Sequence, residues 1–425
     1  MSELGQFLGQ HIAISRRHFA KLGIGSAATL ALWPSLAGGE PSTGSVLAAP
    51  EMADALAKLG SYLTSPDDFQ DVSRGKPLPH SLAEDQKREA GLTRDTWRLE
   101  VISDPENPVV LRMPMAKAEG TALDFAGLMK LAENHAVRFP KIMTCLNMGC
   151  PLGMGIWEGV PLRELVWLTR PNDALRRVFY YGYHNDDPQQ MFRSSLPIGR
   201  VLEDPFDLPP VILCYKLNGQ WLNSVRGGPV RIIVPEAYGF KCVKWLSHVL
   251  LTNLAGANDT YAKENNDIDS PLKSFAATIS VPGKILAGQP IPLTGYAQVG
   301  IGGLSKVQVC ILPDSEEPPA GDPYFATARW QDAEILPAPS NWGGDLPEDK
   351  IPAHTHGFDT GSSQPRTWPM RLTKIHWAAL ISGLPPGKYT LRCRAVDEKG
   401  NGQPMPRPFR KSGHAAIEQV AIEVQ

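Results

Sequence analysis

The sequence predicts a mixed α+β domain followed by an immunoglobulin-like β-sandwich. The chain has 425 residues, more than one ordinary core requires, and 42% of them are hydrophobic, so two cores can be buried. Its 39 prolines and 39 glycines favour short strands joined by turns. Near residue 275 the sequence changes from mixed helical and strand-like segments to short alternating runs alone.

The charge of the chain is nearly balanced. Lysine and arginine number 42, and aspartate and glutamate number 44, which gives a net charge of −2 at pH 7. A strong basic or acidic excess would indicate nucleic acid or an anionic membrane surface as a partner. We therefore expect no nucleic-acid partner and look for function in specific sites.

Residues 1–49 are expected to be an export signal that takes no part in the fold. Arg16 and Arg17 precede a short apolar run at 22–32, and small residues at 46–50 fit a cleavage site. This order is typical of a twin-arginine signal, which predicts a protein that folds around a cofactor and then crosses to the periplasm or cell envelope. The alternatives are an uncleaved anchor and the basic start of an ordinary helix.

The next two segments are predicted to be an arm and a mixed domain. Residues 50–92 are polar and indicate an extended arm that crosses a surface. Residues 93–275 combine both periodicities, as a mixed α+β domain should. We expect strands at 96–102, 176–184, 210–219 and 228–236, and helices at 122–135 and 160–170.

Residues 276–425 are predicted to form the β-sandwich. Short alternating runs recur about every ten residues there without a helical period. A long polar insertion at 344–369 interrupts them and contains His354 and His356. These two histidines could bind a metal, but the missing cysteine and carboxylate partners make unliganded histidines the plainer alternative.

Six cysteines leave several chemistries open. Cys214, Cys310 and Cys393 lie in strand-like runs, where a thiol packs as a small apolar group. A chain of this size does not need a disulfide framework, and it has neither a C-x-x-C-H haem motif nor a C-x-x-C zinc pair. Cys145 and Cys150 stand in a glycine-rich run. From the residues alone they could form a disulfide, a metal site, a cofactor ligand or two packed thiols.

Several segments together resemble the molybdenum enzymes of the sulfite oxidase family. They are "WEGVPL" at 157–162, "SSLPIGRVLEDP" at 194–205, "LNGQWLNSVRGGPVRIIVPEAYGFKCVKWLSHVLLTN" at 217–253 and "YTLRCRAVDEKGNGQP" at 389–404. The resemblance spans roughly residues 96–425. It implies a sulfite-oxidase-type molybdopterin-binding domain at 93–275 and a C-terminal dimerisation domain at 276–425.

This resemblance implies a molybdenum–molybdopterin cofactor held by one cysteine thiolate. Cys145 is the expected metal ligand because it directly follows a strand-like segment and precedes Asn147, as in the family, and Cys150 is the alternative. A soft thiolate suits such a metal, and one cysteine suffices when the pterin supplies two more sulfurs. The other residues that the resemblance places at the cofactor are Asn147, Arg177, Ser195, Gly239, Lys241 and Lys244.

The resemblance also implies residues at the substrate end of the site. Phe192 stands where sulfite oxidases carry a tyrosine, so we expect the site to lack that hydroxyl donor. Arg193 follows Phe192 and could supply a cation for an oxyanion. Arg74 in the arm is the expected match to an arginine that reaches the substrate pocket.

The function that this resemblance implies is the oxidation of sulfite to sulfate by oxygen-atom transfer. Electrons would pass to an external acceptor such as a c-type cytochrome, because the chain has no haem motif, and the C-terminal domain would form a homodimer. A first alternative is a periplasmic sulfoxide reductase of the same superfamily, which Phe192 favours. A second is a non-catalytic binding or assembly subunit that has kept the fold.

Overall fold

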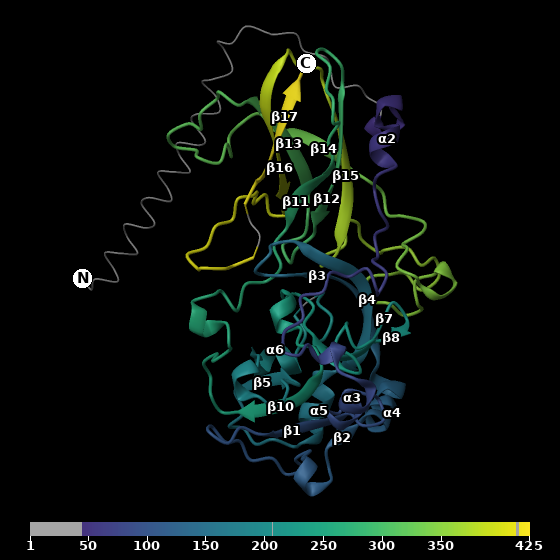
Figure 1. Ribbon diagram of the computed structural model, residues 1–425, viewed down its shortest axis with the longest axis vertical. Coiled ribbons are helices and arrows are strands. Elements are labelled where there is room, and N and C mark those ends of the chain that lie inside the picture. Colours follow the sequence, from purple (N-terminus) through teal and green to yellow (C-terminus); the bar gives the residue numbers. More distant parts are fainter. Residues whose placement is uncertain (1–44, 206, 414–415) are drawn as a thin grey trace, which may run out of the picture. The chain divides into compact units, whose positions relative to one another are not determined.

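The computed structural model describes residues 45–205, 207–413 and 416–425 (Figure 1). Residues 46–425 form one compact unit. The predicted twin-arginine signal, apart from its last residues 45–49, lies outside the described residues. In the described ranges, no helix is both long and apolar enough to cross a membrane.

The N-terminal arm is partly helical and packed. It contains helices α2 (Ala53–Leu56) and α3 (Glu84–Glu89) and the 3-10 turns η1 (Val46–Ala48), η2 (Pro50–Met52) and η3 (Pro79–Ser81). Met52 and Ala55 are buried against Ala378 of the C-terminal domain. Tyr62 and Phe69 are buried as well. The expectation of an arm without packed elements is therefore wrong, because its few apolar residues are anchored in the cores.

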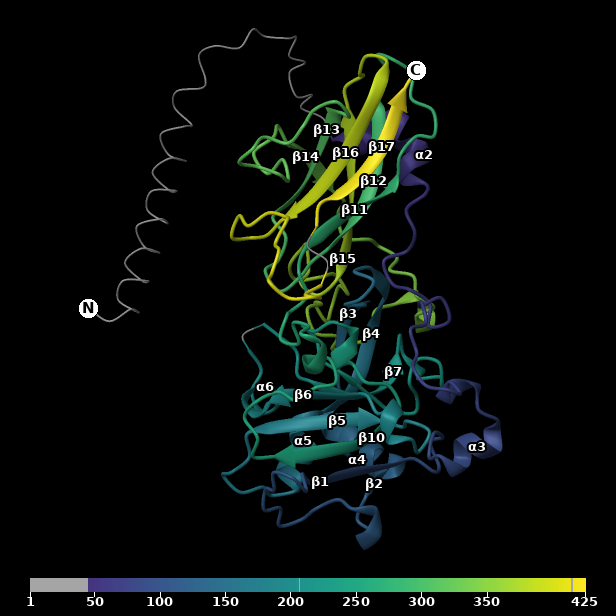
Figure 2. The ribbon, with the colours of Figure 1, turned by 60° about the vertical axis from the view of Figure 1, so that its left-hand side comes forward.

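The first sheet of the α+β domain has the order β2-β1-β10-β5-β6. Figure 2 shows β6, β5, β10 and β1 side by side. Only the β1–β10 pair is parallel. The strands are β1 (Arg98–Ser103), β2 (Leu123–Asp124), β5 (Arg177–Gly182), β6 (Arg193–Pro197) and β10 (Leu246–Thr252).

The first two helices of this domain lie close to where the sequence predicts them, and the third was not predicted. They are α4 (Phe125–His135), α5 (Leu162–Leu168) and α6 (Ile198–Leu202). Asp124 begins α4, since its carboxylate accepts a hydrogen bond of 2.7 Å from the Gly127 N–H. The 3-10 turns are η4 (Lys117–Glu119), η5 (Pro188–Gln190), η6 (Gly239–Lys241) and η7 (Ala262–Glu264).

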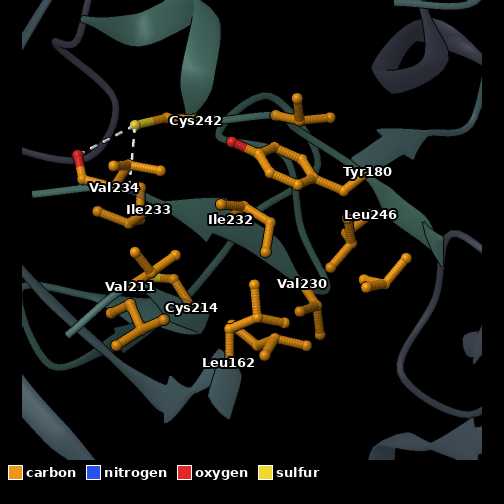
Figure 3. Packing of buried hydrophobic residues seen from close by; sticks show 14 of the residues in the cluster. Leu162, Tyr180, Val211, Cys214, Val230, Ile232, Ile233, Val234, Cys242 and Leu246 are labelled. Atoms are coloured by element: carbon orange, nitrogen blue, oxygen red, sulfur yellow. Dashed lines mark hydrogen bonds between the residues drawn. The ribbon is translucent and has the colours of Figure 1, made fainter. Parts of the chain in front are cut away.

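The second sheet of the domain carries the cysteine loop and the centre of the core. It is antiparallel, with the order β3-β4-β7-β8, and β9 pairs with β7. Its strands are β3 (Val137–Thr144), β4 (Pro151–Pro161), β7 (Ile212–Leu217), β8 (Gln220–Trp221) and β9 (Arg231–Ile233). Figure 3 shows Leu162, Val230 and Ile232 packed together in this core. The loop 145–150 joins β3 to β4 at the edge of this packed region.

The C-terminal strands pair in the order β11-β12-β15-β14-β13-β16-β17, and they lie together in Figure 1. They are β11 (Phe275–Ser280), β12 (Ile291–Gln298), β13 (Lys306–Pro313), β14 (Gln331–Ile335), β15 (Lys374–Ile381), β16 (Gly387–Val396) and β17 (Glu418–Val424). β11 also contacts β16 and β17, which folds the sheet over one core around Trp377 and Leu391. The predicted fold class is confirmed. The insertion 344–369, with η8 (Pro347–Asp349), is packed, because Leu346 and Phe358 are buried.

Two leucines of α5 test this packing. Leu162 is fully buried, whereas Leu168 is 44% exposed. Leu162→Ala should lower the free energy of unfolding by about 2–5 kcal/mol, because the substitution leaves a cavity. Leu168→Ala is the matched control and should cost about 0.5 kcal/mol. Urea unfolding followed by tryptophan fluorescence measures both, and equal losses would contradict this orientation of the helix.

Candidate functional site

A cavity of about 190 Å³ lies between the arm, the β3–β4 loop and the segments that surround β9 and η6. Its walls bring together side chains from distant parts of the chain, which is the usual construction of a small-molecule site. Six residues predicted from the sequence line it, namely Arg74, Cys145, Asn147, Phe192, Gly239 and Lys244.

Cys145 is the first residue of the tight loop between β3 and β4. Its N–H donates to the Cys150 carbonyl over 3.2 Å, and the Gly149 N–H donates to the Cys145 carbonyl over 2.9 Å. Cys145 lines the cavity, whereas Cys150 does not. Burial, and then the neighbouring Cys145, raise the pKa of the Cys150 thiol. The geometry therefore favours Cys145 as the thiolate ligand.

None of the six cysteines forms a disulfide. Cys214, Cys310 and Cys393 are buried in β7, β13 and β16, as expected from their alternating sequences. Cys242 is also buried, and Figure 3 shows its sulfur at the backbone of Val234.

Gly153, in the glycine-rich segment that follows the loop, is a position where a side chain would not fit. It has a φ of 154°, and a Cβ atom there would lie 2.5 Å from Cδ1 of Phe69. The Phe69 ring also meets the Trp157 ring edge-on, with centroids 5.8 Å apart. The small residue thus lets the arm pack directly on β4 and close one side of the cavity.

Two buried arginines line another wall. The exposed fraction is 6% for Arg226 and 5% for Arg231. Arg226 donates to the Phe69 carbonyl at 2.7 Å, and Arg231 donates to the carbonyls of Arg226 at 2.8 Å and Cys242 at 2.6 Å. Their buried Nε atoms have no hydrogen-bond partner among the residues that the structure describes. Such donors call for an acceptor, as a bound anion would provide.

Lys244 extends this basic wall and ties it to the arm. Its Nζ donates to Asp71 Oδ1 at 2.8 Å and to Ser73 Oγ at 2.7 Å. Gly227, with a φ of 93°, makes room for this side chain, because a Cβ there would lie 2.6 Å from Lys244 Cγ. The position of the Lys244 side chain therefore requires glycine at residue 227.

The electrostatics of the basic wall favour an anionic ligand. Burial lowers the pKa of Lys244 to about 8, and Arg231 adds to the shift against the attraction of Asp71. Burial alone would raise the pKa of Asp71, but hydrogen bonds from Lys244 and Ser73 lower it to about 2. Among these four charged residues, one carboxylate thus faces three cations, including Arg226, and the excess positive charge is available to a phosphate.

A tyrosine hydroxyl stands in the cavity. Arg74 Nη2 donates to Tyr261 Oη at 2.6 Å, and Asn147 Nδ2 donates to the same oxygen at 2.8 Å. Because arginine can only donate, the hydroxyl oxygen acts as an acceptor, and its own proton remains free to bond a ligand. Phe192 lacks a hydroxyl, as predicted, but Tyr261 brings one to the cavity from a different segment of the chain.

Two aromatic rings pack against the ring of Tyr261. The Phe192 ring meets the Tyr261 ring edge-on at 5.1 Å, and the Phe240 ring stacks on it at 5.3 Å. The Arg74 guanidinium lies 4.5 Å from the centroid of Phe192. This end of the cavity therefore combines one arginine with largely apolar walls.

Three predicted cofactor-binding residues lie in a buried network behind the cavity. Lys241 Nζ donates to Asp259 Oδ2 and to the Ser195 carbonyl, both at 2.7 Å. Ser195 Oγ donates to Asp259 Oδ1 at 2.5 Å, and Arg177 donates to Ser195 Oγ at 3.1 Å. None of these three residues lines the cavity, so the geometry does not support direct cofactor contacts by them. They anchor Asp259, two residues before Tyr261.

Arg193 also points elsewhere. Its guanidinium donates to the Asn258 carbonyl at 3.1 Å and lies 4.8 Å from the centroid of the Phe179 ring. It does not line the cavity. The predicted contact of this arginine with an oxyanion is therefore not supported, and Arg74 is the arginine beside Tyr261.

Sequence reasoning missed Arg226, Arg231 and Tyr261 as site residues. Arg231 had a usable signal, because a charged residue inside the apolar run 230–234 is expected to be buried and to need a partner. Tyr261 had none. It lies outside the strands and helices, and only the tertiary structure brings it to Arg74.

The two histidines of the insertion do not gather metal ligands. His354 and His356 line a second cavity with Arg138 and Arg366. Burial lowers the pKa of His356, and Arg366 lowers it further. Within the described part of the chain, no group of three or more histidine, cysteine or acidic side chains could hold a metal ion. These histidines thus lack the further ligands that a structural metal site requires.

The comparisons with known proteins agree with this site. Residues 87–258 match the family model of the oxidoreductase molybdopterin binding domain. This part of the chain is therefore a molybdopterin-binding oxidoreductase domain. This domain occurs in molybdopterin enzymes of the sulfite oxidase family.

Curated relatives match only part of their own length. A nitrate reductase [NADH] 2 of Arabidopsis thaliana is 27% identical over 184 residues, which cover 41% of this chain and 20% of the relative. A nitrate reductase [NADH] of Volvox carteri is 30% identical over 127 residues, covering 28% and 14%. The chain thus matches a fifth or less of the length of each of these two relatives.

A solved structure has the same fold over most of the chain. The sulfane dehydrogenase SoxCD from Paracoccus pantotrophus is 18% identical, with a TM-score of 0.54. The similarity covers 78% of this chain and 77% of that chain. It includes more than the residues 87–258 that the family model matches.

The residues of the cavity fit the molybdenum–molybdopterin cofactor of this family. Cys145 offers the soft sulfur ligand that molybdenum prefers. The unpartnered Nε donors of Arg226 and Arg231, with Lys244 beside them, suit the phosphate of the pterin. The two chemistries occupy walls of the same cavity, as one extended cofactor requires.

The basic wall predicts pH-dependent anion binding by the cofactor-free protein. Lys244 is charged below its pKa of about 8 and loses this charge as the pH rises through that value. Binding of sulfate, whose charge is constant here, should weaken about tenfold from pH 7 to 9.5. Calorimetric titration measures it. Lys244→Met should bind weakly at both pH values, and Lys306→Met, at an exposed ion pair, should behave as wild type.

Proposed function

We propose that this chain is an exported molybdenum enzyme that transfers an oxygen atom at the sulfur of a small compound, with the oxidation of sulfite to sulfate as the first candidate reaction. The observation that carries the proposal is the placement of Cys145, Arg74 and Tyr261 around one cavity. The shared fold with a protein named sulfane dehydrogenase supports sulfur chemistry. The partial matches to nitrate reductases support the cofactor more than the substrate.

Each wall of the cavity has a separate task in this proposal. When bound, the molybdenum cofactor supplies the redox centre that exchanges oxygen and two electrons. Cys145 binds the metal, while Arg226, Arg231 and Lys244 bind the anionic end of the pterin. These four contacts orient the cofactor in the cavity.

Arg74 and Tyr261 serve the substrate. The Arg74 guanidinium attracts an oxyanion, and the free proton of the Tyr261 hydroxyl donates a hydrogen bond to a substrate oxygen. The bonds from Arg74 and Asn147 fix this hydroxyl before the substrate arrives. Such preorganised donors stabilise a transition state without rearrangement.

The electron acceptor, the cellular location and the oligomeric state are further parts of this proposal. Sulfite and water give sulfate, two protons and two electrons, which must leave singly or together to an external acceptor. We infer a c-type cytochrome as that acceptor, since the chain has no C-x-x-C-H motif of its own. The arginine pair at 16–17 supports export to the periplasm or cell envelope, and the C-terminal sandwich supports a homodimer.

The reduction of a sulfoxide is a second candidate. The Phe192 and Phe240 rings pack against the Tyr261 ring, and Arg74 is the one arginine that hydrogen-bonds the Tyr261 hydroxyl among the described residues. A neutral sulfoxide with apolar substituents suits such walls, whereas a dianion gains more from several cations. The same cofactor can transfer oxygen in either direction.

Steady-state assays of the purified holoenzyme separate these reactions. Sulfite with oxidised cytochrome c is tested against methionine sulfoxide with a reduced dye. Turnover of sulfite supports the first candidate, and turnover of sulfoxide alone supports the second. No turnover with either compound, together with metal-free protein from a host that makes the cofactor, would support a non-catalytic subunit.

The cofactor ligand is tested by comparing two cysteine variants. Wild-type protein from a host that makes the cofactor should contain about one molybdenum per chain, in keeping with a single-thiolate site. Cys145→Ser should lose it or hold it weakly, and Cys150→Ser should retain it. Elemental analysis and pterin fluorescence measure both. The opposite result for the two variants would move the ligand to Cys150.

The role of Tyr261 is tested by removing only its hydroxyl. Tyr261→Phe should lower kcat about a hundredfold with the preferred substrate, because one preorganised donor is lost in the transition state. Molybdenum content should stay unchanged. Tyr324→Phe, at an exposed tyrosine of the C-terminal domain, is the control. An increase of KM alone would limit Tyr261 to ground-state binding.

A further inference from the structure

We propose that the C-terminal sandwich positions the thiol-bearing loop of the catalytic domain through one buried hydrogen bond, between Gln298 and Thr144. Thr144 is the last residue of β3 and directly precedes Cys145. Gln298 is the last residue of β12. The inference rests on the proposed role of Cys145 as cofactor ligand, and it assigns Gln298 and Thr144 as positioning residues.

The geometry of this bond determines which group donates. Thr144 Oγ1 lies 2.5 Å from Gln298 Oε1, and both residues are fully buried. Gln298 Nε2 donates to the Lys273 carbonyl at 2.7 Å. Because the amide nitrogen is bound to a carbonyl, the amide oxygen must face Thr144 and accept its hydroxyl proton. Both ends of the glutamine side chain are thus held, which leaves it one orientation.

Further contacts hold both strands that flank the loop. The Ile142 N–H of β3 donates to the Leu372 carbonyl at 2.7 Å. On the other side, the Lys374 N–H contacts the Met154 sulfur of β4 at 3.2 Å. Leu372 and Lys374 belong to the C-terminal part of the chain, at and before β15. The sandwich therefore supports the loop from both sides, and Thr144 is the supported residue next to the thiol.

The position of Thr144 has a direct consequence for Cys145. A metal ligand must be held within roughly 0.5 Å of its productive position by supporting contacts. Within the loop, the N–H groups of Cys145 and Gly149 donate hydrogen bonds, and the Asn147 side chain adds one to Tyr261. Loss of the Thr144 hydroxyl would leave the buried Gln298 oxygen without this donor and allow the start of the loop to move. The C-terminal domain would then act on the site in addition to any role in dimerisation.

Variants at the two ends of the bond test this proposal. Thr144→Val removes the hydroxyl at nearly constant volume, and Thr144→Ser retains it. Gln298→Leu removes the acceptor. Gln308→Leu is the matched control, because Gln308 is a buried glutamine of the same domain that bonds Asp332 and Arg394, away from the loop.

Two measurements give the readout. One is the rate of molybdenum release from the holoenzyme to a chelator. The other is the rate at which iodoacetamide alkylates Cys145 in cofactor-free protein, followed by peptide mass spectrometry. In Thr144→Val and Gln298→Leu, both rates should rise about threefold to tenfold, the range expected for one lost hydrogen bond. Thr144→Ser and Gln308→Leu should keep the wild-type rates, and the double variant should exceed neither single variant.

The proposal would be overturned if Thr144→Val lowered the melting temperature as Gln308→Leu does and left both rates unchanged, because the bond would then only stabilise the fold. A wild-type protein that takes up no molybdenum would refute the proposed function instead. In that case the alkylation rates of the cofactor-free variants still decide whether Gln298 positions the thiol.

Discussion

The excess of buried positive charge along one wall of the cavity is the constraint on which the site depends. Arg226, Arg231 and Lys244 share the carboxylate of Asp71, which comes from the arm, and Asp67 also attracts Arg226. Burying unpaired cations is costly unless an anion offsets them. The wall therefore favours a folded arm, which delivers Asp71 and Ser73, and a bound phosphate for the donors that the protein leaves without acceptors.

The substrate end of the cavity depends on a different kind of support. Asp259 is held by Lys241 and Ser195 in a buried network, and this network fixes the segment that ends in Tyr261. Arg74 and Asn147 then orient the tyrosine hydroxyl. The network thus places the segment that contains Tyr261, and two residues of the cavity wall orient its hydroxyl. Such indirect support explains why Lys241, Ser195 and Arg177 are buried polar residues that do not line the cavity.

The end of the cavity that carries Cys145 is supported by the C-terminal sandwich. Thr144 and Gln298 link β3 to β12, next to Cys145. The arm and the α+β domain thus line the cavity, and the sandwich supports the strand that precedes Cys145.

The sequence by itself determined the fold class, α+β followed by a β-sandwich, because periodicity and turn residues are local signals. It also singled out Cys145, Asn147 and Lys244 for the site, through a resemblance that extends over several segments. Only the tertiary structure decided that Lys241, Ser195 and Arg177 lie behind the cavity and that Tyr261 supplies a hydroxyl within it. The physical reason is that side-chain direction and long-range contacts, such as Arg74 with Tyr261, depend on packing between segments far apart in the chain.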